Sequence, residues 1–378
     1  MTTKPMVGSD DIAAMVAAVC EHASGVRGDV REVVAAEVDR LAPLATPDVR
    51  EAVIARAVAR FDGLDVIELY LRDPDVDEVM VNAGREVWVE RRGTMRLAGH
   101  LPAGAIDVVL ERVLAPTGRR VDRAHPIVDL RLSNGARLCA VIDPIAVDGT
   151  CVSIRQHRRR PFALDAFAAD RATLAMLDEV VATRCNLLVS GATSSGKTTF
   201  VAALLQRADP ADRLVVCEDT AELMLGGRHA VRLEARAASA DGLAAVDLAA
   251  LVRAALRLRP DRLVVGEFRG PEVLAAVEAM NTGHDGSLST CHANSAADAL
   301  RRVETLLMQA APTWPLAAIR RQVSRSIDVV IHLERDGRGR RSIAEVVEVE
   351  EGDGEPSVHT LTTSAGRSGQ LTRGRRSR

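Results

Sequence analysis

The segment with the clearest chemical potential is Gly191-Ala192-Thr193-Ser194-Ser195-Gly196-Lys197-Thr198, which fits GxxxxGK[ST] at every fixed position. Glycines permit backbone conformations that side chains would block, so consecutive N–H groups can curl round a phosphate. The lysine ammonium adds positive charge near the terminal phosphates, and the Thr198 hydroxyl can ligate Mg²⁺. An apolar strand over residues 186–190 and a helix over 198–205 supply the context that such a loop needs. The pattern predicts a nucleotide site.

Hydrolysis of a bound nucleotide also needs acids that hold the metal and position water. Two acidic clusters follow short apolar runs: Glu218-Asp219-Thr220-Ala221-Glu222 comes after residues 214–217, and Gly266-Glu267 comes after residues 263–265. The carboxyl ends of parallel strands form the usual ligand-binding edge of an α/β sheet. We therefore expect both clusters to lie beside the phosphate loop.

A group of basic residues lies between the two acidic clusters in the sequence. Its members are Arg253, Arg257, Arg259 and Arg262. They form either a solvated helix face or a group of guanidiniums that reaches phosphate across a subunit boundary. Residues 282–294 then carry His284 and His292, eight apart in a polar stretch with glycines and without metal-ligand spacing. They are either ordinary surface or core histidines or part of a loop that senses the γ-phosphate.

The elements that must position these residues fall into parts of different character. Residues 1–64 are predicted to be a small helical segment, and 65–157 a mixed α+β domain with turns at Asn134-Gly135 and Asp148-Gly149. Residues 158–362 alternate strand, turn and helix, as in a parallel sheet covered on both faces. The fold class is thus α/β, a RecA-like P-loop domain after an α+β domain. Arg158-Arg159-Arg160-Pro161 is the expected linker, and residues 363–378, with five arginines and no acid, are expected to be a disordered basic tail.

Composition narrows the classes of partner. The 378-residue chain has a net charge of −3, so no overall positive potential attracts nucleic acid. Only 2% of its residues are aromatic, so few side chains are available on which bases could stack. Its six cysteines form no CxxC pair, which argues against zinc and disulfides and fits a reducing cytoplasm. We recognise no signal peptide and no apolar run of about 18 residues, so a membrane link is expected to come through a partner.

Taken together, these motifs resemble the secretion ATPase superfamily (type II/IV secretion traffic ATPases), in particular the CpaF-type Flp/Tad pilus assembly ATPases. The resemblance spans about residues 65–350. It is carried by the phosphate loop and by these segments: Asp77-Glu78-Val79-Met80-Val81-Asn82, Arg120-Val121-Asp122, Pro126-Ile127-Val128-Asp129-Leu130-Arg131-Leu132, Val152-Ser153-Ile154-Arg155, Cys217-Glu218-Asp219-Thr220-Ala221-Glu222-Leu223, Gly266-Glu267-Phe268-Arg269-Gly270 and Met280-Asn281-Thr282-Gly283-His284-Asp285-Gly286.

The resemblance implies a role for each motif. It implies that Glu218 orients the attacking water, that Glu267 acts on Mg²⁺ through water in an atypical Walker B motif, and that His292 belongs to the family's His box. The implied ATP-binding set is Gly191, Ala192, Thr193, Ser194, Ser195, Gly196, Lys197, Thr198 and Thr199, with Arg120, Arg131 and Arg155 closing over the nucleotide. It further implies a homo-hexamer at the cytoplasmic side of the inner membrane, working with membrane-embedded platform proteins.

Two departures from the family pattern leave alternatives open. Ser194 stands where the family usually has glycine, and the loop can accommodate serine at this position. The four-cysteine zinc module of some relatives is absent, which points to the Tad branch or to conjugation-type motors that move DNA or protein. The prediction is a hexameric ATP hydrolase that powers Tad/Flp pilus assembly or secretion. The alternative that is not an enzyme is a switch or scaffold that binds ATP without hydrolysing it. A metabolic kinase would need a phosphate-acceptor pocket and a lid, and neither is recognisable in the sequence.

Overall fold

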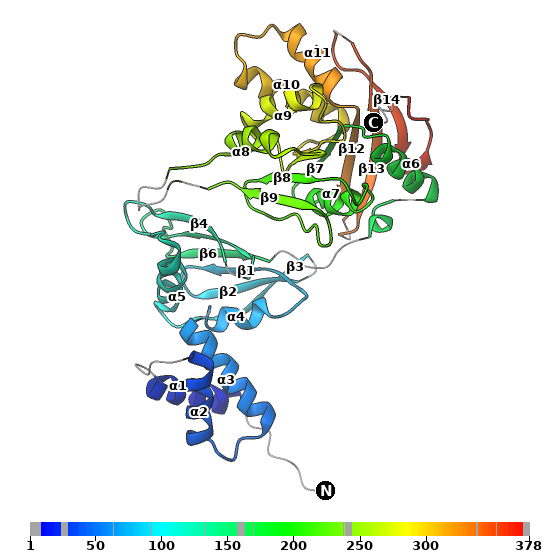
Figure 1. Cartoon of the computed structure of the whole chain (residues 1–378). Helices are drawn as coiled ribbons and strands as arrows, with labels where there is room; N and C mark the ends of the chain where they lie inside the picture. The colour runs from blue at the N-terminus through cyan, green and yellow to red at the C-terminus, as the bar shows by residue number, and fades with distance from the viewer. Residues whose placement is uncertain are drawn as a thin grey trace. The chain divides into compact units, whose positions relative to one another are not determined.

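The computed structural model describes residues 9–23, 29–62, 64–91, 93–132, 134–156, 163–168, 170–236, 238, 244–337, 339–352 and 354–372. The chain divides into unit 1, Met1–Arg158, and unit 2, Arg159–Arg378 (Figure 1). The linker expected at residues 158–161 lies outside the described residues.

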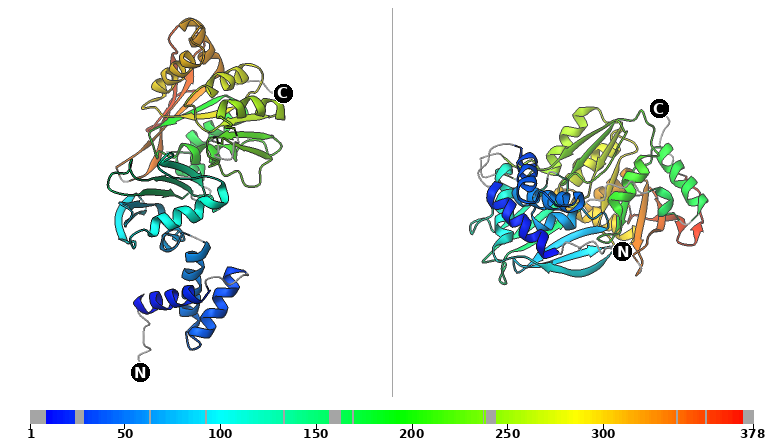
Figure 2. Two further views of the ribbon diagram at one scale, coloured as in Figure 1. Left: turned by 90° about the vertical axis from the view of Figure 1, so that its left-hand side faces the viewer. Right: turned by 90° about the horizontal axis from the view of Figure 1, so that it is seen from below.

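Unit 1 begins with a small group of helices, drawn in blue in Figure 2. These are α1 (Ser9–Ala23), α2 (Val30–Leu41), α3 (Pro47–Asp62) and α4 (Val66–Leu71). Val19, Val34 and Val38 are buried between the first three, so the predicted helical segment has its own core. Pro47 is the first residue of α3, where its missing N–H has no partner to lose.

The rest of unit 1 is a six-stranded antiparallel sheet of order β3-β2-β1-β6-β5-β4. Its elements are β1 (Val76–Asn82), β2 (Glu86–Arg91), β3 (Thr94–His100), α5 (Ala105–Leu114), β4 (Ile127–Arg131), β5 (Arg137–Val141) and β6 (Cys151–Arg155). The hairpin predicted at Asn134-Gly135 joins β4 to β5, with Gly135 at φ +89°. β3 was not predicted, because it is an exposed edge strand without apolar alternation.

Unit 2 is built on a nine-stranded sheet of order β15-β14-β13-β12-β7-β11-β10-β8-β9. Six strands are parallel: β7 (Leu187–Gly191), β8 (Leu214–Glu218), β9 (Ala230–Glu234), β10 (Arg262–Val265), β11 (Leu288–Cys291) and β12 (Val329–Arg335). The antiparallel strands β13 (Arg341–Val349), β14 (Val358–Thr363) and β15 (Gly366–Arg367) extend it at one edge.

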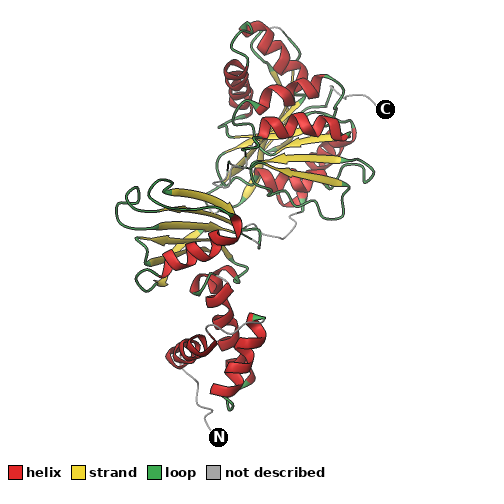
Figure 3. Ribbon diagram, turned by 60° about the vertical axis from the view of Figure 1, so that its left-hand side comes forward, coloured by secondary structure: helices red, strands yellow, loops and turns green. Residues whose placement is uncertain are grey.

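Helices cover both faces of this sheet, as Figure 3 shows. One face carries α8 (Leu248–Ala255), α9 (Glu272–Asn281), α10 (Ala296–Ala310) and α11 (Leu316–Ser326), and the other carries α6 (Arg171–Ala182) and α7 (Lys197–Leu205). Successive residues of β7 alternate between the two cores: Leu188 packs with the first helices, and Leu187 and Val189 with the second. The predicted parallel sheet with two covered faces is therefore confirmed.

Two predictions need correction. Within the predicted loop 282–294, residues Leu288–Cys291 form the buried strand β11. This strand was not predicted because its serine and threonine are polar residues typical of loops. The tail expected to be disordered from residue 363 is ordered as far as Thr372, because β15 pairs with β14 and Thr372 donates two hydrogen bonds to Glu348. Residues 373–378 lie outside the described part. Among the described helices, none combines the length and apolar character needed to cross a bilayer.

Candidate nucleotide-binding and hydrolysis site

The phosphate loop joins β7 to α7 at the carboxyl edge of the parallel strands. Gly191 has φ +153°, Ser194 φ +63° and Gly196 φ +94°, so three of its residues have positive φ values. A Cβ on Gly191 would lie 2.5 Å from the carbonyl oxygen of Leu333, which explains why only glycine fits there. Gly196 is the N-cap of α7, whose free N–H groups therefore point out of the helix start.

Lys197 is held inside this loop. Its side chain is 7% exposed, and Nζ donates to the carbonyl oxygens of Gly191 at 2.9 Å and Ala192 at 3.1 Å. Burial lowers the pKa of Lys197, and the nearby carboxylate of Glu267 opposes that shift. The ammonium thus lies inside the phosphate loop, bonded to two of its carbonyl oxygens.

Glu267 and His292 meet beside that lysine. Nδ1 of His292 lies 3.2 Å from Nζ of Lys197, and Nε2 lies 3.3 Å from Oε1 of Glu267. Burial lowers the pKa of His292, with Glu267 opposing and Lys197 reinforcing the shift. The sequence-predicted Walker A lysine, Walker B glutamate and His-box histidine therefore form one contiguous cluster.

The strand β11 brings His292 to this place. It lies between β7 and β10, so the residue after its end emerges between the phosphate loop and Glu267. Thr290 donates its hydroxyl to the carbonyl of Gly266 at 2.7 Å and accepts the N–H of Phe268 through its own carbonyl at 2.8 Å. These bonds hold the residues on either side of Glu267 against β11, the strand that His292 follows.

Glu218 ends β8 and is 3% exposed. Its Oε1 accepts the N–H groups of Glu222 at 3.0 Å and Leu223 at 2.9 Å, whereas the buried Oε2 has no hydrogen-bond partner. Burial raises the pKa of Glu218 to about 7, although the two backbone N–H groups oppose the shift. Oε2 lies 4.0 Å from the guanidinium of Arg232. An oriented carboxylate with a pKa near neutrality and one oxygen that accepts no hydrogen bond is suited to accept a proton from water.

Arg269 is a member of the cluster to which sequence reasoning gave no role. Its guanidinium donates to Oε2 of Glu267 at 2.8 Å and lies 3.9 Å from Oδ2 of Asp219. It thereby connects the loops after β10 and β8. Sequence reasoning could have identified Arg269 from its position two residues after Glu267, within a motif that had already been recognised.

The four arginines between the acidic clusters do not act as one group. Arg262 is buried and pairs with Asp212 at 2.7 Å, so its role is structural. Arg253 is exposed near the end of α8, and Arg257 and Arg259 are exposed around the short 3₁₀ turn Leu256–Leu258 that follows. Only these three remain available to a partner.

The unit 1 arginines occupy exposed positions on their own domain. Arg131 and Arg155 end β4 and β6, and Arg137 of β5 is the cross-strand partner of both, so the three form one row on a sheet face. Arg120 lies apart, on the loop before β4. Sequence reasoning did not single out Arg137; its place opposite both recognised arginines becomes visible only through strand register.

The oxygen donors present fit a magnesium ion bound with a nucleotide. Mg²⁺ prefers oxygen ligands and in P-loop proteins takes most of them from phosphate and water, with one protein hydroxyl and a nearby acid. Thr198, in the first turn of α7, and Glu267 supply those two groups.

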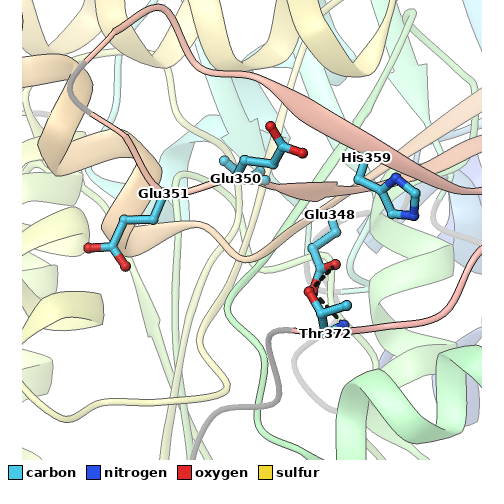
Figure 4. Close-up of a pocket in the computed structure, with 6 residues that line it drawn as sticks. Glu348, Glu350, Glu351, His359 and Thr372 are labelled. Atoms are coloured by element: carbon cyan, nitrogen blue, oxygen red, sulfur yellow. Dashed lines mark hydrogen bonds between the residues drawn. The ribbon is translucent and has the colours of Figure 1, made fainter.

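Unit 2 also has a pocket between the end of β13, the start of β14 and the C-terminal segment (Figure 4). Its lining includes Glu348, Glu350 and Glu351, together with His359. Carboxylates repel phosphate, so this pocket does not suit a nucleotide.

Comparisons with known proteins agree with this geometry. Residues 61–340 match the family described as "Type II/IV secretion system protein". A putative conjugal transfer protein of Mycobacterium tuberculosis is 38% identical over 314 residues, which cover 79% of this chain and 88% of that relative. The conjugal transfer protein TrbB of Rhizobium radiobacter is 33% identical over 294 residues, covering 76% and 87%. The chain belongs to the type II/IV secretion system protein family.

A solved structure shows the same fold. The ATPase DotB of Legionella pneumophila is similar with a TM-score of 0.54 and 19% identity, covering 76% of this chain and 80% of that one. The expected α/β architecture, with an N-terminal domain before a P-loop domain, is confirmed.

Proposed function

We propose that this member of the type II/IV secretion family hydrolyses ATP to ADP and phosphate, and that hydrolysis drives movement of a membrane-embedded apparatus. The observation that carries the proposal is the contact of His292 with both Lys197 and Glu267. A simple nucleotide-binding scaffold needs the phosphate loop alone. The additional acid and imidazole, which lie beside the lysine of the phosphate loop, favour an enzyme over a switch.

In the proposed mechanism, Lys197 exchanges its carbonyl contacts for oxygens of the β- and γ-phosphates. Thr198, through its hydroxyl, and Glu267 would hold a Mg²⁺ ion, and the bound ion would supply neutralisation of phosphate charge. Glu218 orients the attacking water with Oε2, which has no hydrogen-bond partner, and accepts its proton. His292 senses the γ-phosphate from its place beside Lys197. Catalysis then consists of positioning and charge stabilisation.

We propose that ATP hydrolysis powers Tad/Flp-type pilus assembly or secretion. The active form would be a homo-hexamer at the cytoplasmic face of the inner membrane, which acts through platform proteins. The support is the resemblance of the motifs in both halves of the chain together with the absence of a four-cysteine module in the sequence. The exposed arginines Arg120, Arg131 and Arg155 would close over ATP from the first domain of the same or a neighbouring subunit.

A conjugation-type motor that moves DNA or protein is the second candidate. It is favoured by a specific observation, because two relatives that cover most of this chain are named as conjugal transfer proteins. A motor that contacts DNA should bind it with an affinity that falls steeply with salt. The net charge of −3 and the scarcity of aromatic residues weigh against a DNA-handling surface.

Phosphate release measured together with mass by light scattering tests the enzymatic proposal. We expect Mg²⁺-dependent turnover in a hexamer-sized species, lost in Lys197→Ala and Glu267→Gln, with ATP binding retained in the second variant. Glu278→Gln is the matched control, since Glu278 is an exposed glutamate of α9. Wild-type protein that binds ATP without turnover, alone and with platform protein, would establish the switch instead.

The cargo is tested in the native host with the Glu267→Gln replacement on the chromosome. Loss of pili with unchanged plasmid transfer supports the Tad assignment. Loss of transfer with pili intact supports the conjugation motor, and survival of both refutes a motor role.

A further inference from the structure

Both carboxylate oxygens of Glu267 have a partner in the structure. Nη2 of Arg269 donates to Oε2 at 2.8 Å, and Nε2 of His292 lies 3.3 Å from Oε1. The side chain of Glu267 is only 16% exposed, so it is enclosed at the position where these two partners meet it. The arginine therefore holds one oxygen of the carboxylate while the other oxygen meets the imidazole.

The guanidinium of Arg269 also reaches the acidic loop that follows β8. Its Nη1 lies 3.9 Å from Oδ2 of Asp219, the residue after Glu218. A guanidinium presents several N–H donors in one rigid plane, so a single side chain can meet two carboxylates at once. Arg269 thus joins Glu267 to the loop that carries the proposed base.

A buried carboxylate holds the backbone that carries Arg269. Glu272, the first residue of α9, is 4% exposed, and its Oε1 accepts the N–H groups of Arg269 at 2.5 Å and Gly270 at 2.8 Å. On the other side of Arg269, Phe268 is 2% exposed and its N–H donates to the carbonyl of Thr290 at 2.8 Å. The turn is therefore fixed on both sides of the arginine.

Arg269 differs in one respect from an ordinary surface arginine. Its own side chain is 55% exposed, and exposed ion pairs contribute little to stability. Its partner Glu267, however, is mostly buried and contacts His292, which in turn contacts Lys197. The effect of the ion pair is thus expected on the orientation of Glu267, with little effect on the stability of the fold.

We propose that Arg269 is a positioning residue, which holds the Glu267 carboxylate in the orientation required for ATP hydrolysis and is itself held in place by Glu272. The role rests on the proposed ATPase function, because it is exerted through Glu267. It differs from the roles expected for Arg120, Arg131 and Arg155, which are directed at the nucleotide itself.

Phosphate release and titration with fluorescent ADP, both on the full-length protein, test the proposal. We expect Arg269→Ala to lower kcat roughly 10–100-fold, the range for loss of a group that orients a carboxylate ligand, with KM and ADP affinity little changed. Arg269→Lys should recover part of kcat, because an ammonium can still donate to Oε2 of Glu267, whereas Arg269→Met should not.

The matched control is Arg325→Ala. Arg325 is 56% exposed and pairs with Glu351 at 2.8 Å, so it equals Arg269 in exposure and ion-pair distance but lies in α11. Its replacement should leave kcat unchanged.

Thermal melting and Glu272 variants separate positioning from folding. Arg269→Ala should keep the melting temperature of the wild type. Glu272→Ala should lower both kcat and the melting temperature, because two backbone N–H groups lose their acceptor. Glu272→Gln keeps a carbonyl oxygen and should preserve both. Retention of full kcat in Glu272→Ala would contradict the part assigned to Glu272.

Other outcomes overturn the role of Arg269. Unchanged kcat in Arg269→Ala excludes it. A loss of ADP affinity as large as the loss of kcat means that Arg269 binds the nucleotide directly, and a lowered melting temperature without rescue by Arg269→Lys means a structural contact only. Failure of the proposed ATPase function is distinguishable, because wild-type protein would then bind ADP without releasing phosphate, which would also remove this role.

Discussion

Nε2 of His292 lies 3.3 Å from Oε1 of Glu267. On its other side the ring faces Nζ of Lys197, and an ammonium can only donate, so Nδ1 accepts and Nε2 carries the proton toward Glu267. The imidazole is thus a neutral bridge between Walker A and Walker B. In the proposed mechanism Lys197 exchanges its carbonyl partners for phosphate oxygens while Nδ1 of His292 stays beside it, so the histidine can transmit phosphate occupancy to the catalytic acid.

We therefore predict that His292→Ala lowers kcat on the order of 10²–10³-fold, in the range for loss of one positioned hydrogen-bonding group. ADP affinity should change little, because the proposed role of His292 is toward the γ-phosphate, which ADP lacks. Phosphate release and ADP titration measure the two effects. His284→Ala is the control, since His284 bonds to the carbonyl of Ala279 and lies outside the cluster. Equal losses in kcat for both variants would contradict the bridging role.

The pH profile of turnover should report Glu218. Burial raises the pKa of this carboxyl to about 7, and a general base must be ionised to accept the proton of water. We predict that kcat falls about tenfold per pH unit below pH 7 and levels off above it. Glu218→Gln should abolish turnover at every pH. A profile that stays flat from pH 6 to 8 excludes Glu218 as the base.

The same group should make the nucleotide-free fold less stable at high pH. The pKa of Glu218 rises from 4.5 to about 7 on folding, so the folded state binds the proton more tightly than the unfolded chain. That contribution is full below pH 4.5 and is lost as pH rises through about 7.

Glu218→Gln should accordingly raise the free energy of unfolding at pH 8 by roughly 1–3 kcal/mol and change it little at pH 5. Urea denaturation at both pH values measures the difference, with Glu278→Gln as the exposed control. Destabilisation at pH 8 would mean that the amide disrupts the bonds from Glu222 and Leu223.

Gly191→Ala should disrupt the phosphate loop itself. The new Cβ would lie 2.5 Å from a backbone oxygen of Leu333 at a φ of +153°, so neither rotation nor side-chain movement relieves the clash. We expect a loss of about 2 kcal/mol or more in unfolding free energy. Gly226→Ala is the matched control, because its Cβ has no neighbour within 4 Å. Equal stability of the two variants would refute this packing.

The sequence predicted the site best where fixed spacing carries the chemistry. Gly191 to Thr198 specify a phosphate loop locally, and Glu267 follows an apolar run, so both lie where expected. β11 was missed because Ser289 and Thr290 look like loop residues, although neighbouring strands and the carbonyl of Gly266 satisfy them in the core. The packing of Arg341 on Gly196 joins residues about 145 positions apart, and only tertiary structure reveals such a contact.

The arginine row of unit 1 provides the last prediction. Arg131, Arg137 and Arg155 are cross-strand neighbours; Arg137 pairs with Asp129 at 3.4 Å, and Glu78 lies opposite Arg155. Arg155 is exposed at the end of β6 and is one of the arginines that the resemblance places over the nucleotide, and guanidinium geometry suits phosphate oxygens. We predict that Arg155→Ala lowers kcat on the order of 10³-fold, as for loss of an arginine finger, and leaves ADP affinity and the melting temperature unchanged.

Mixing experiments show which subunit the arginine serves. If Arg155 acts on ATP of a neighbouring subunit, mixed rings of Arg155→Ala and Lys197→Ala contain some sites with both residues intact, and phosphate release should recover. If it acts within its own subunit, each site keeps one defect and the mixture stays inactive. Arg96→Ala, which alters an exposed arginine of β3 outside the row, is the control. Unchanged turnover in Arg155→Ala alone would remove the row from the mechanism.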